Sequence, residues 1–404
     1  MTKTSLEKIK SIINKKVGHD VAYNLTKDES PATVKDWIST GSFLLDCTIA
    51  RGIKAGIPVG RITEIASLSG VGKSYLAAQI AVNAQKKGYH VVYFDSERAI
   101  DSEFLINAGC DLDHLTYILP DDIRQMFEIM EAVLSEEEMG RVVFILDSLA
   151  MLPDLTDVEG DFNPSSSVSV KARTISKGIS KLLGPLNRAG ATWVILNHLK
   201  TNISPEASSK YATDEVKYFT PGGLSVAYAC HLRIWLVKPH AKASFVEDEK
   251  GFIIGSTVKA KLIKSRYGTE KRKCEFKILW GDPNRVGVCD DESLFEVVKI
   301  SPRYRTGGPW KFLMGDDKQE VKFQEKDWSD LLKNDANFFA LVMKVVEEEM
   351  VVNFNEKKNA ADFYFDKETD EGHKEIPNFP DQPTEKLNEK KGSSVVSFGE
   401  KDEE

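Results

Sequence analysis

The sequence is poor in cysteine and has no long apolar run. Its five cysteines are far apart and form no C-x-x-C pair: Cys47, Cys110, Cys230, Cys274 and Cys289. This pattern argues against a disulfide framework and a zinc site. No run of about 18 apolar residues occurs, so no membrane-spanning helix is expected. Residues 1–16 lack the apolar core of a signal peptide, and a cytoplasmic protein is predicted.

The sequence also lacks the basic excess that is typical of nucleic-acid-binding domains. Its net charge is −8 at pH 7. The charge is unevenly distributed, because residues 357–404 hold thirteen acidic and eight basic side chains and so carry −5, which leaves −3 for the rest. A local basic groove is therefore compatible with the composition.

Short apolar runs alternate with helix-length segments in the middle of the chain. Buried strands are expected at Arg61–Ala66, His90–Asp95, Val142–Asp147, Thr192–Asn197 and His231–Val237. Helices are expected between them, for example over Tyr75–Lys87 and Met126–Met139. Thr257–Ile263 and Cys274–Trp280 are predicted to form a hairpin. The pattern predicts an α/β domain with a mostly parallel twisted sheet.

Four segments are expected along the chain. Residues 1–34 are predicted to form a helix and a linker, and residues 35–284 the α/β core. Residues 285–355 have the pattern of a small α+β domain that ends in an apolar helix. Residues 356–404 are polar and rich in charge, which is typical of a disordered acidic tail.

A phosphate-binding loop is predicted at Ser67–Ser74, because the segment follows a strand and precedes a helix. Glycines let backbone N–H groups surround phosphate oxygens, and the helix N-terminus adds a positive dipole. Ser67 stands where the motif usually begins with glycine. An ordinary Gly/Ser turn is the alternative, which the flanking elements disfavour. The expected nucleotide contacts are Ser69, Gly70, Val71, Gly72, Lys73, Ser74 and Tyr75.

Two further strands end in carboxylates. Lys73 is expected to reach the β- and γ-phosphates of ATP, while Ser74 and Asp147 would hold Mg²⁺. Glu97 follows the strand that ends at Asp95, where it is placed to orient an attacking water. A helix cap or a surface carboxylate is an equally good interpretation of Glu97 from the residues alone.

Several segments together resemble the RecA family, over about residues 35 to 282. They are Ile38–Ser42 with Leu45–Asp46, Gly60–Ile65, Phe94–Asp101, Asp147–Ala150, Val158–Gly160 and Thr220–Gly223. Asn197–His198 and Lys264–Arg266 most resemble the phage (UvsX) branch, since cellular bacterial members usually have glutamine where His198 stands. The resemblance implies a RecA-type P-loop NTPase core, with ATP and Mg²⁺ as cofactors.

The resemblance also implies roles for single residues. Glu97 would activate the hydrolytic water, and His198 would sense the γ-phosphate. Lys264 and Arg266 would reach the ATP of the next subunit. Three residues would surround the adenine: Asp101, Phe104 and Trp280.

Two loops, 154–168 and 200–223, are expected to bind DNA. Basic side chains neutralise phosphates, and aromatic ones stack on bases. Exposed loops without a ligand are the alternative, which their position after strand ends disfavours. The expected DNA contacts are Arg173, Lys200, Lys210, Lys217, Gly222 and Gly223.

The resemblance implies a DNA-dependent ATPase that forms an open helical filament on single-stranded DNA and exchanges it with homologous duplex DNA. The N-terminal helix would dock onto the neighbouring copy, or else pack on its own chain. A single-strand-binding protein and a mediator protein are possible further partners, and a phage-encoded chain would act in the host cytoplasm. The alternatives are a hexameric helicase-type motor and a regulatory nucleotide-binding scaffold.

Overall fold

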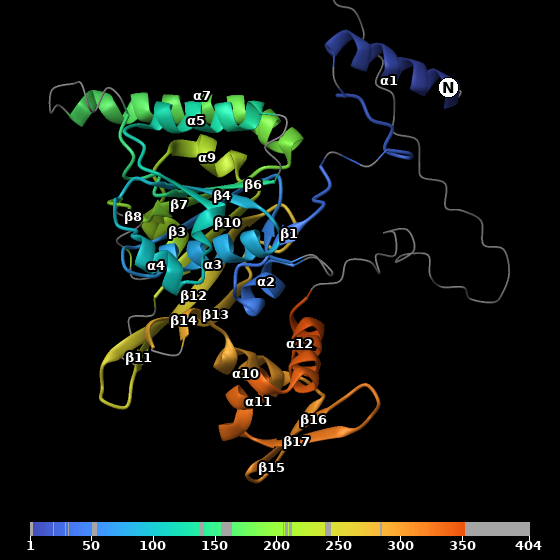
Figure 1. The fold of residues 1–404 in the computed structure, drawn as a ribbon, viewed down its shortest axis with the longest axis vertical. Coiled ribbons are helices and arrows are strands. Elements are labelled where there is room, and N and C mark those ends of the chain that lie inside the picture. Colours follow the sequence, from blue (N-terminus) through green and yellow to red (C-terminus); the bar gives the residue numbers. More distant parts are fainter. Residues whose placement is uncertain are drawn as a thin grey trace, which may run out of the picture. The chain divides into compact units, whose positions relative to one another are not determined.

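The computed structural model describes residues 3–18, 20–28, 30, 32–50, 55–136, 141–154, 164–204, 206, 209, 212–238, 244–282 and 285–351. Within these ranges, helices cover both faces of a ten-stranded sheet (Figure 1). Two hydrophobic clusters lie on its opposite faces. No helix in these ranges is long and apolar enough to cross a membrane.

The sheet is mostly parallel, with an antiparallel extension on one side. Its order is β14-β13-β12-β10-β3-β7-β6-β4-β5, and β11 pairs with β12. The parallel strands are β3 (Ile62–Ser67), β4 (His90–Asp95), β5 (Leu115–Ile118), β6 (Val142–Asp147), β7 (Thr192–His198) and β10 (Leu232–Val237). The antiparallel strands are β11 (Phe245–Glu247), β12 (Ile253–Ser265), β13 (Lys273–Asp282) and β14 (Arg285–Cys289).

Alternate residues of each strand face the two helical layers. Val143 and Ile145 of β6 lie in the cluster that includes α3, whereas Phe144 and Leu146 lie in the other. The first layer contains α2 (Phe43–Ile49), α3 (Lys73–Lys86) and α4 (Ser102–Asn107), and the second contains α5 (Ile123–Ser135), α7 (Pro164–Ala189) and α9 (Gly223–Ala229). This alternation is what burial on both faces of a parallel sheet requires.

Short strands pair outside the main sheet. β1 (Trp37–Ile38) pairs with β2 (Ile57–Pro58), and β8 (Lys200–Thr201) pairs with β9 (Tyr218–Phe219) after the short helix α8 (Asp214–Lys217). The second pair stands at the base of the segment that follows β7.

The described C-terminal residues form a small α+β unit. It comprises α10 (Asp291–Ile300), β15 (Tyr304–Gly307), β16 (Trp310–Met314), β17 (Glu320–Gln324), α11 (Trp328–Asn334) and α12 (Ala336–Met350). Its core is aromatic: Phe295, Phe323, Trp328 and Phe338 have ring centroids within 6.3 Å of one another where they contact. Asp290, just before α10, accepts a hydrogen bond from Ser42 at 2.8 Å.

The N-terminal helix α1 (Lys3–Val17) presents its apolar face to solvent. Ile12 is 68% exposed, and Leu6, Ile9 and Ile13 are also exposed. Lys10 bonds to Asp28, so the segment after the helix folds back along it. An apolar face that the described residues leave exposed is suited to contact with another molecule.

Several boundaries differ by one to four residues from those predicted from the sequence, among them those of α5 and β12. The helix expected over Met126–Met139 begins at Ile123 and ends at Ser135, because Asp122 caps it by accepting from Arg124 and Gln125. Lys264, which follows the predicted strand Thr257–Ile263, lies within β12, where it is paired with Arg233 of β10.

Candidate active site

The phosphate loop connects β3 to α3. Gly70 has a φ of 71° and Gly72 a φ of 111°, values that side chains disfavour. A Cβ on Gly72 would also lie 2.5 Å from the Ile278 side chain, which would have to shift to admit a larger residue. Lys73 opens the helix and is buried, with only 7% of its surface exposed.

Ser74 and Asp147 meet at the end of the loop. The Ser74 hydroxyl donates to Asp147 Oδ2 at 2.7 Å, and the Tyr93 hydroxyl donates to the same oxygen at 3.2 Å. The pair offers hard oxygen donors side by side, which is the donor set that Mg²⁺ prefers. The residues present therefore fit the expected magnesium site.

Burial shapes the charges of this site. It lowers the pKa of Lys73, while the nearby carboxylates of Asp147 and Glu97 act in the opposite direction. It raises the pKa of Asp147, which the Ser74 hydrogen bond and Lys73 partly oppose. A buried cation beside the buried Asp147 carboxylate suits a site that takes up a polyphosphate and its cation together.

Glu97 accepts two hydrogen bonds on one oxygen. Its Oε1 lies 2.7 Å from the Ser148 hydroxyl and 2.7 Å from His198 Nε2. Burial raises the pKa of Glu97, but these hydrogen bonds outweigh it and leave the pKa below its ordinary value. The structure thus brings Glu97 and His198 together from β4 and β7, and Ser148 is a partner that the sequence analysis did not identify.

Asp95 holds the turn that carries Glu97. Its carboxylate accepts from the backbone N–H groups of residues 97 to 100 at 2.8–3.0 Å and from the Tyr117 hydroxyl at 2.7 Å. Within this turn Arg98 adopts a φ of 53°. Glu97 therefore caps no helix here, and its carboxylate is bonded to Ser148 and His198 instead.

The three residues expected around the adenine lie in two places. Asp101 caps α4 by accepting from Phe104 N at 2.7 Å, and Phe104 packs edge-on against Tyr75 with ring centroids 4.9 Å apart. Trp280 lies near the end of β13, where the Lys238 ammonium is 5.7 Å from its ring centroid. Both aromatic residues border the cluster that contains α3.

Lys264 and Arg266 lie toward the opposite edge of the sheet. Lys264 Nζ donates to the carbonyls of Ala227 and Tyr228 at 2.7 and 2.9 Å, and Arg266 donates to that of Tyr228 at 3.1 Å. Lys264 pairs with Arg233, three residues before Leu236, which pairs with Ser67 at the phosphate loop. At about 3.3 Å per strand residue, the backbone of Lys264 is on the order of 10 Å, measured along the strands, from the phosphate loop of its own chain.

The expected DNA contacts are only partly described. Arg173 and Lys200 are exposed, and Lys217 is half-buried at the end of α8. Gly222 and Gly223 have φ values of 106° and 76°, and a Cβ on Gly222 would lie 2.8 Å from Val226. Lys210 and most of the first loop lie outside the described residues. Three apolar side chains close by were not foreseen and are exposed: Met151, Ile203 and Leu224.

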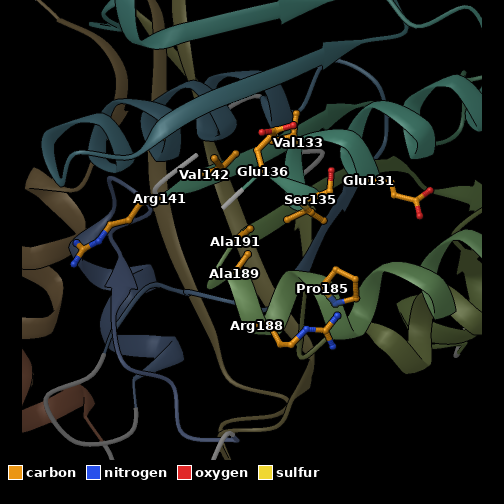
Figure 2. Close-up of a pocket in the computed structure, with 11 residues that line it drawn as sticks. Glu131, Val133, Ser135, Glu136, Arg141, Val142, Pro185, Arg188, Ala189 and Ala191 are labelled. Carbon is orange, nitrogen blue, oxygen red and sulfur yellow. The ribbon is translucent and has the colours of Figure 1, made fainter. Parts of the chain in front are cut away.

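A hollow of about 790 Å³ lies at the amino ends of the strands, away from the phosphate loop (Figure 2). Its lining comes from the end of α5, the end of α7 and the starts of β6 and β7, and includes Arg141, Arg188 and Glu131. None of the groups described above reaches it.

Comparison with known proteins identifies the family that this chain resembles. The model of the RecA N-terminal domain family matches residues 4–284. Protein RecA of Sulfurimonas denitrificans is 31% identical over 290 residues, 71% of this chain and 79% of that protein. Protein RecA of Nitratiruptor is 28% identical over 323 residues (79% and 88%), and that of Aquifex aeolicus is 28% identical over 334 residues (82% and 90%).

Proposed function

The chain belongs to the RecA family, and we propose that it is an ATP-dependent DNA recombinase. It forms a helical filament on single-stranded DNA and catalyses pairing and strand exchange with homologous duplex DNA. One observation carries this proposal: Glu97 beside the phosphate loop contacts His198, the last residue of β7, two residues before the loop expected to bind DNA. ATP use and DNA binding are thereby adjacent in one chain.

The residues divide the work of hydrolysis. Lys73 neutralises charge on the β- and γ-phosphates from a buried position, where its field is weakly screened. Mg²⁺ held by Ser74 and Asp147 supplies charge neutralisation when bound. Glu97, kept ionised by its two hydrogen bonds, accepts a proton from the attacking water.

His198 links the two activities. In this structure Nε2 of the His198 ring is bonded to Glu97. Contact between this nitrogen and a γ-phosphate therefore requires the ring to move or the nitrogen to share its bond with Glu97. We propose that this movement alters the start of the segment that follows β7. Lys264 and Arg266 contact neutral carbonyls near the end of α9, and we propose that they turn to the γ-phosphate of a neighbouring copy in the filament.

The proposed roles assign each segment a task. Residues 1–34 join neighbouring copies through the exposed face of α1, and residues 35–284 form the ATPase and DNA-binding core. The accessory domain expected over 285–355 begins at α10, because β14 (Arg285–Cys289) pairs with β13 in the main sheet, and residues 356–404 form an acidic tail. His198 and Lys264–Arg266 favour the phage branch of the family, with action in the host cytoplasm beside a single-strand-binding protein and a mediator.

Electron microscopy with single-stranded DNA and a non-hydrolysable ATP analogue tests the proposal. We expect open helical filaments that require the nucleotide. Closed rings would favour a helicase-type motor. A joint-molecule assay with homologous duplex DNA distinguishes a recombinase from a nucleotide-binding scaffold, which would yield no joint molecules.

A further inference from the structure

A carboxylate lies in the middle of the sheet where the active site does not use it. Glu64 of β3 is completely buried, and its charge is costly there unless both oxygens are bonded. Oε2 accepts from Arg233 Nε of β10 at 2.5 Å, and Oε1 accepts from the Asn197 amide of β7 at 2.8 Å. Three adjacent strands therefore converge on one side chain.

Both hydrogen-bond partners of Glu64 also bond to residues at the end of the second loop. Arg233 Nη2 donates to the Thr220 hydroxyl at 2.9 Å. The Asn197 amide nitrogen also donates to the Pro221 carbonyl at 2.9 Å, and its oxygen accepts from the backbone N–H of His198 at 3.0 Å. Each polar atom of the Asn197 side chain is used, which fixes its orientation.

These bonds join the two ends of segment 199–221. Its start follows His198, which Asn197 holds, and its end at Thr220–Pro221 is held by Arg233 and Asn197. Between them β8 pairs with β9, so the ends are also tied by a short ladder. The backbone N–H of His198 is thus linked to Thr220 through the side chains of Asn197, Glu64 and Arg233, and to Pro221 directly through Asn197.

We propose that Glu64 and Arg233 are positioning residues for the second DNA loop. They fix the position of the loop's end, Thr220–Pro221, relative to His198. The state of the nucleotide site then sets the conformation in which the loop contacts DNA. The inference rests on the proposed function, because it requires that this loop bind DNA and that ATP tighten that binding.

Thr220→Val tests the proposal at the rim, where folding is least affected. It removes the hydroxyl that Arg233 binds. The matched control is Thr116→Val on β5, which also removes one side-chain hydrogen bond, to His90 at 2.8 Å, far from both loops in the sheet order. The quantity measured is the ratio of the dissociation constants for a labelled single-stranded oligonucleotide with ADP and with a non-hydrolysable ATP analogue.

We expect Thr220→Val to lower this ratio about fivefold or more, and Thr116→Val to leave it within about twofold. Nucleotide affinity should be unchanged in both. If Thr220→Val weakens DNA binding equally with ADP and the analogue, the bond only shapes the loop and the proposal is wrong. A wild-type ratio near one would instead contradict the proposed function itself.

Two core variants complete the test. Glu64→Gln should also lower the ratio, because the new amide presents a donor to the buried Arg233 guanidinium. Circular dichroism shows whether this variant folds. If it does not fold, the result for Thr220→Val decides the test. Arg233→Lys retains the charge near Glu64 but not the second nitrogen that reaches Thr220. In that background Thr220→Val should have no further effect, and an undiminished effect would show that the coupling does not pass through Arg233.

Discussion

The two ends of the central strands are built from different kinds of contact. At the carboxyl end, Ser74 is bonded to Asp147, and Glu97 is bonded to His198. Toward the amino end of β10, Lys264 and Arg266 are bonded to backbone carbonyls of α9. Charge-assisted bonds between side chains preorganise the first site, whereas cations on neutral carbonyls retain charge for a stronger anionic partner. The first site lies within one chain, and the second is proposed to act on the nucleotide of a neighbouring copy.

Lys73→Ala should have the largest effect at the carboxyl end. Loss of a buried charge that stabilises the transferred phosphate should lower ATPase activity by about 100-fold or more. The control is Lys86→Ala on the last, exposed turn of the same helix. Steady-state ATPase assays with DNA measure the activity of both variants. Near wild-type activity of Lys73→Ala would show that Ser67–Ser74 is not the phosphate-binding loop.

Glu97→Gln should separate binding from hydrolysis at the same end. The amide keeps the shape but cannot accept the proton, so we expect hydrolysis to fall by about 100-fold or more. Nucleotide and DNA affinities, measured by fluorescence titration, should stay within about threefold of wild type. Hydrolysis at the wild-type rate would mean that another residue positions the water.

Ser148→Ala should have a smaller, pH-dependent effect. The Ser148 hydroxyl stabilises ionised Glu97 and helps to lower its pKa, so its removal raises that pKa. Because the base must be ionised, the acid limb of kcat/KM should shift to higher pH, with little change above neutrality. The pH profile is compared with that of Ser135→Ala, at the exposed end of α5. Identical acid limbs in the two variants would contradict the role of Ser148.

Removal of residues 357–404 should have the smallest effect and involves neither site directly. The segment carries a net charge of −5, and its repulsion of DNA should weaken binding by a few fold at low salt. The truncated chain should bind single-stranded DNA more tightly at low ionic strength, and the difference should vanish as salt rises. Equal affinities at low salt would rule out an electrostatic role.

The sequence predicted the residues at the carboxyl end of the sheet better than the side-chain contacts that join one strand to another. The phosphate loop, Asp147 and Glu97 lie at the ends of apolar runs, where local pattern is informative, and the main strands were placed within a few residues. β5 was missed because its residues are only partly buried at the edge of the sheet.

Long-range contacts account for the residues that were missed. Ser148 contacts Glu97 across 51 positions, and Asn197 contacts Glu64 across 133. A single polar residue within an apolar strand carries no local sign of such a partner. These contacts depend on strand order, which one sequence does not specify.

A subunit-mixing experiment most directly tests the claim that the second site requires another copy. The double variant Lys264→Ala/Arg266→Ala has an intact Glu97, and Glu97→Gln has an intact cation pair; each alone should have little DNA-stimulated ATPase activity. In an equal mixture, about a quarter of the interfaces would combine an intact Glu97 with an intact pair from the neighbour. We predict that the mixture regains up to about that fraction of wild-type activity. No regain, with co-assembly verified by fluorescence energy transfer between labelled variants, would contradict the account.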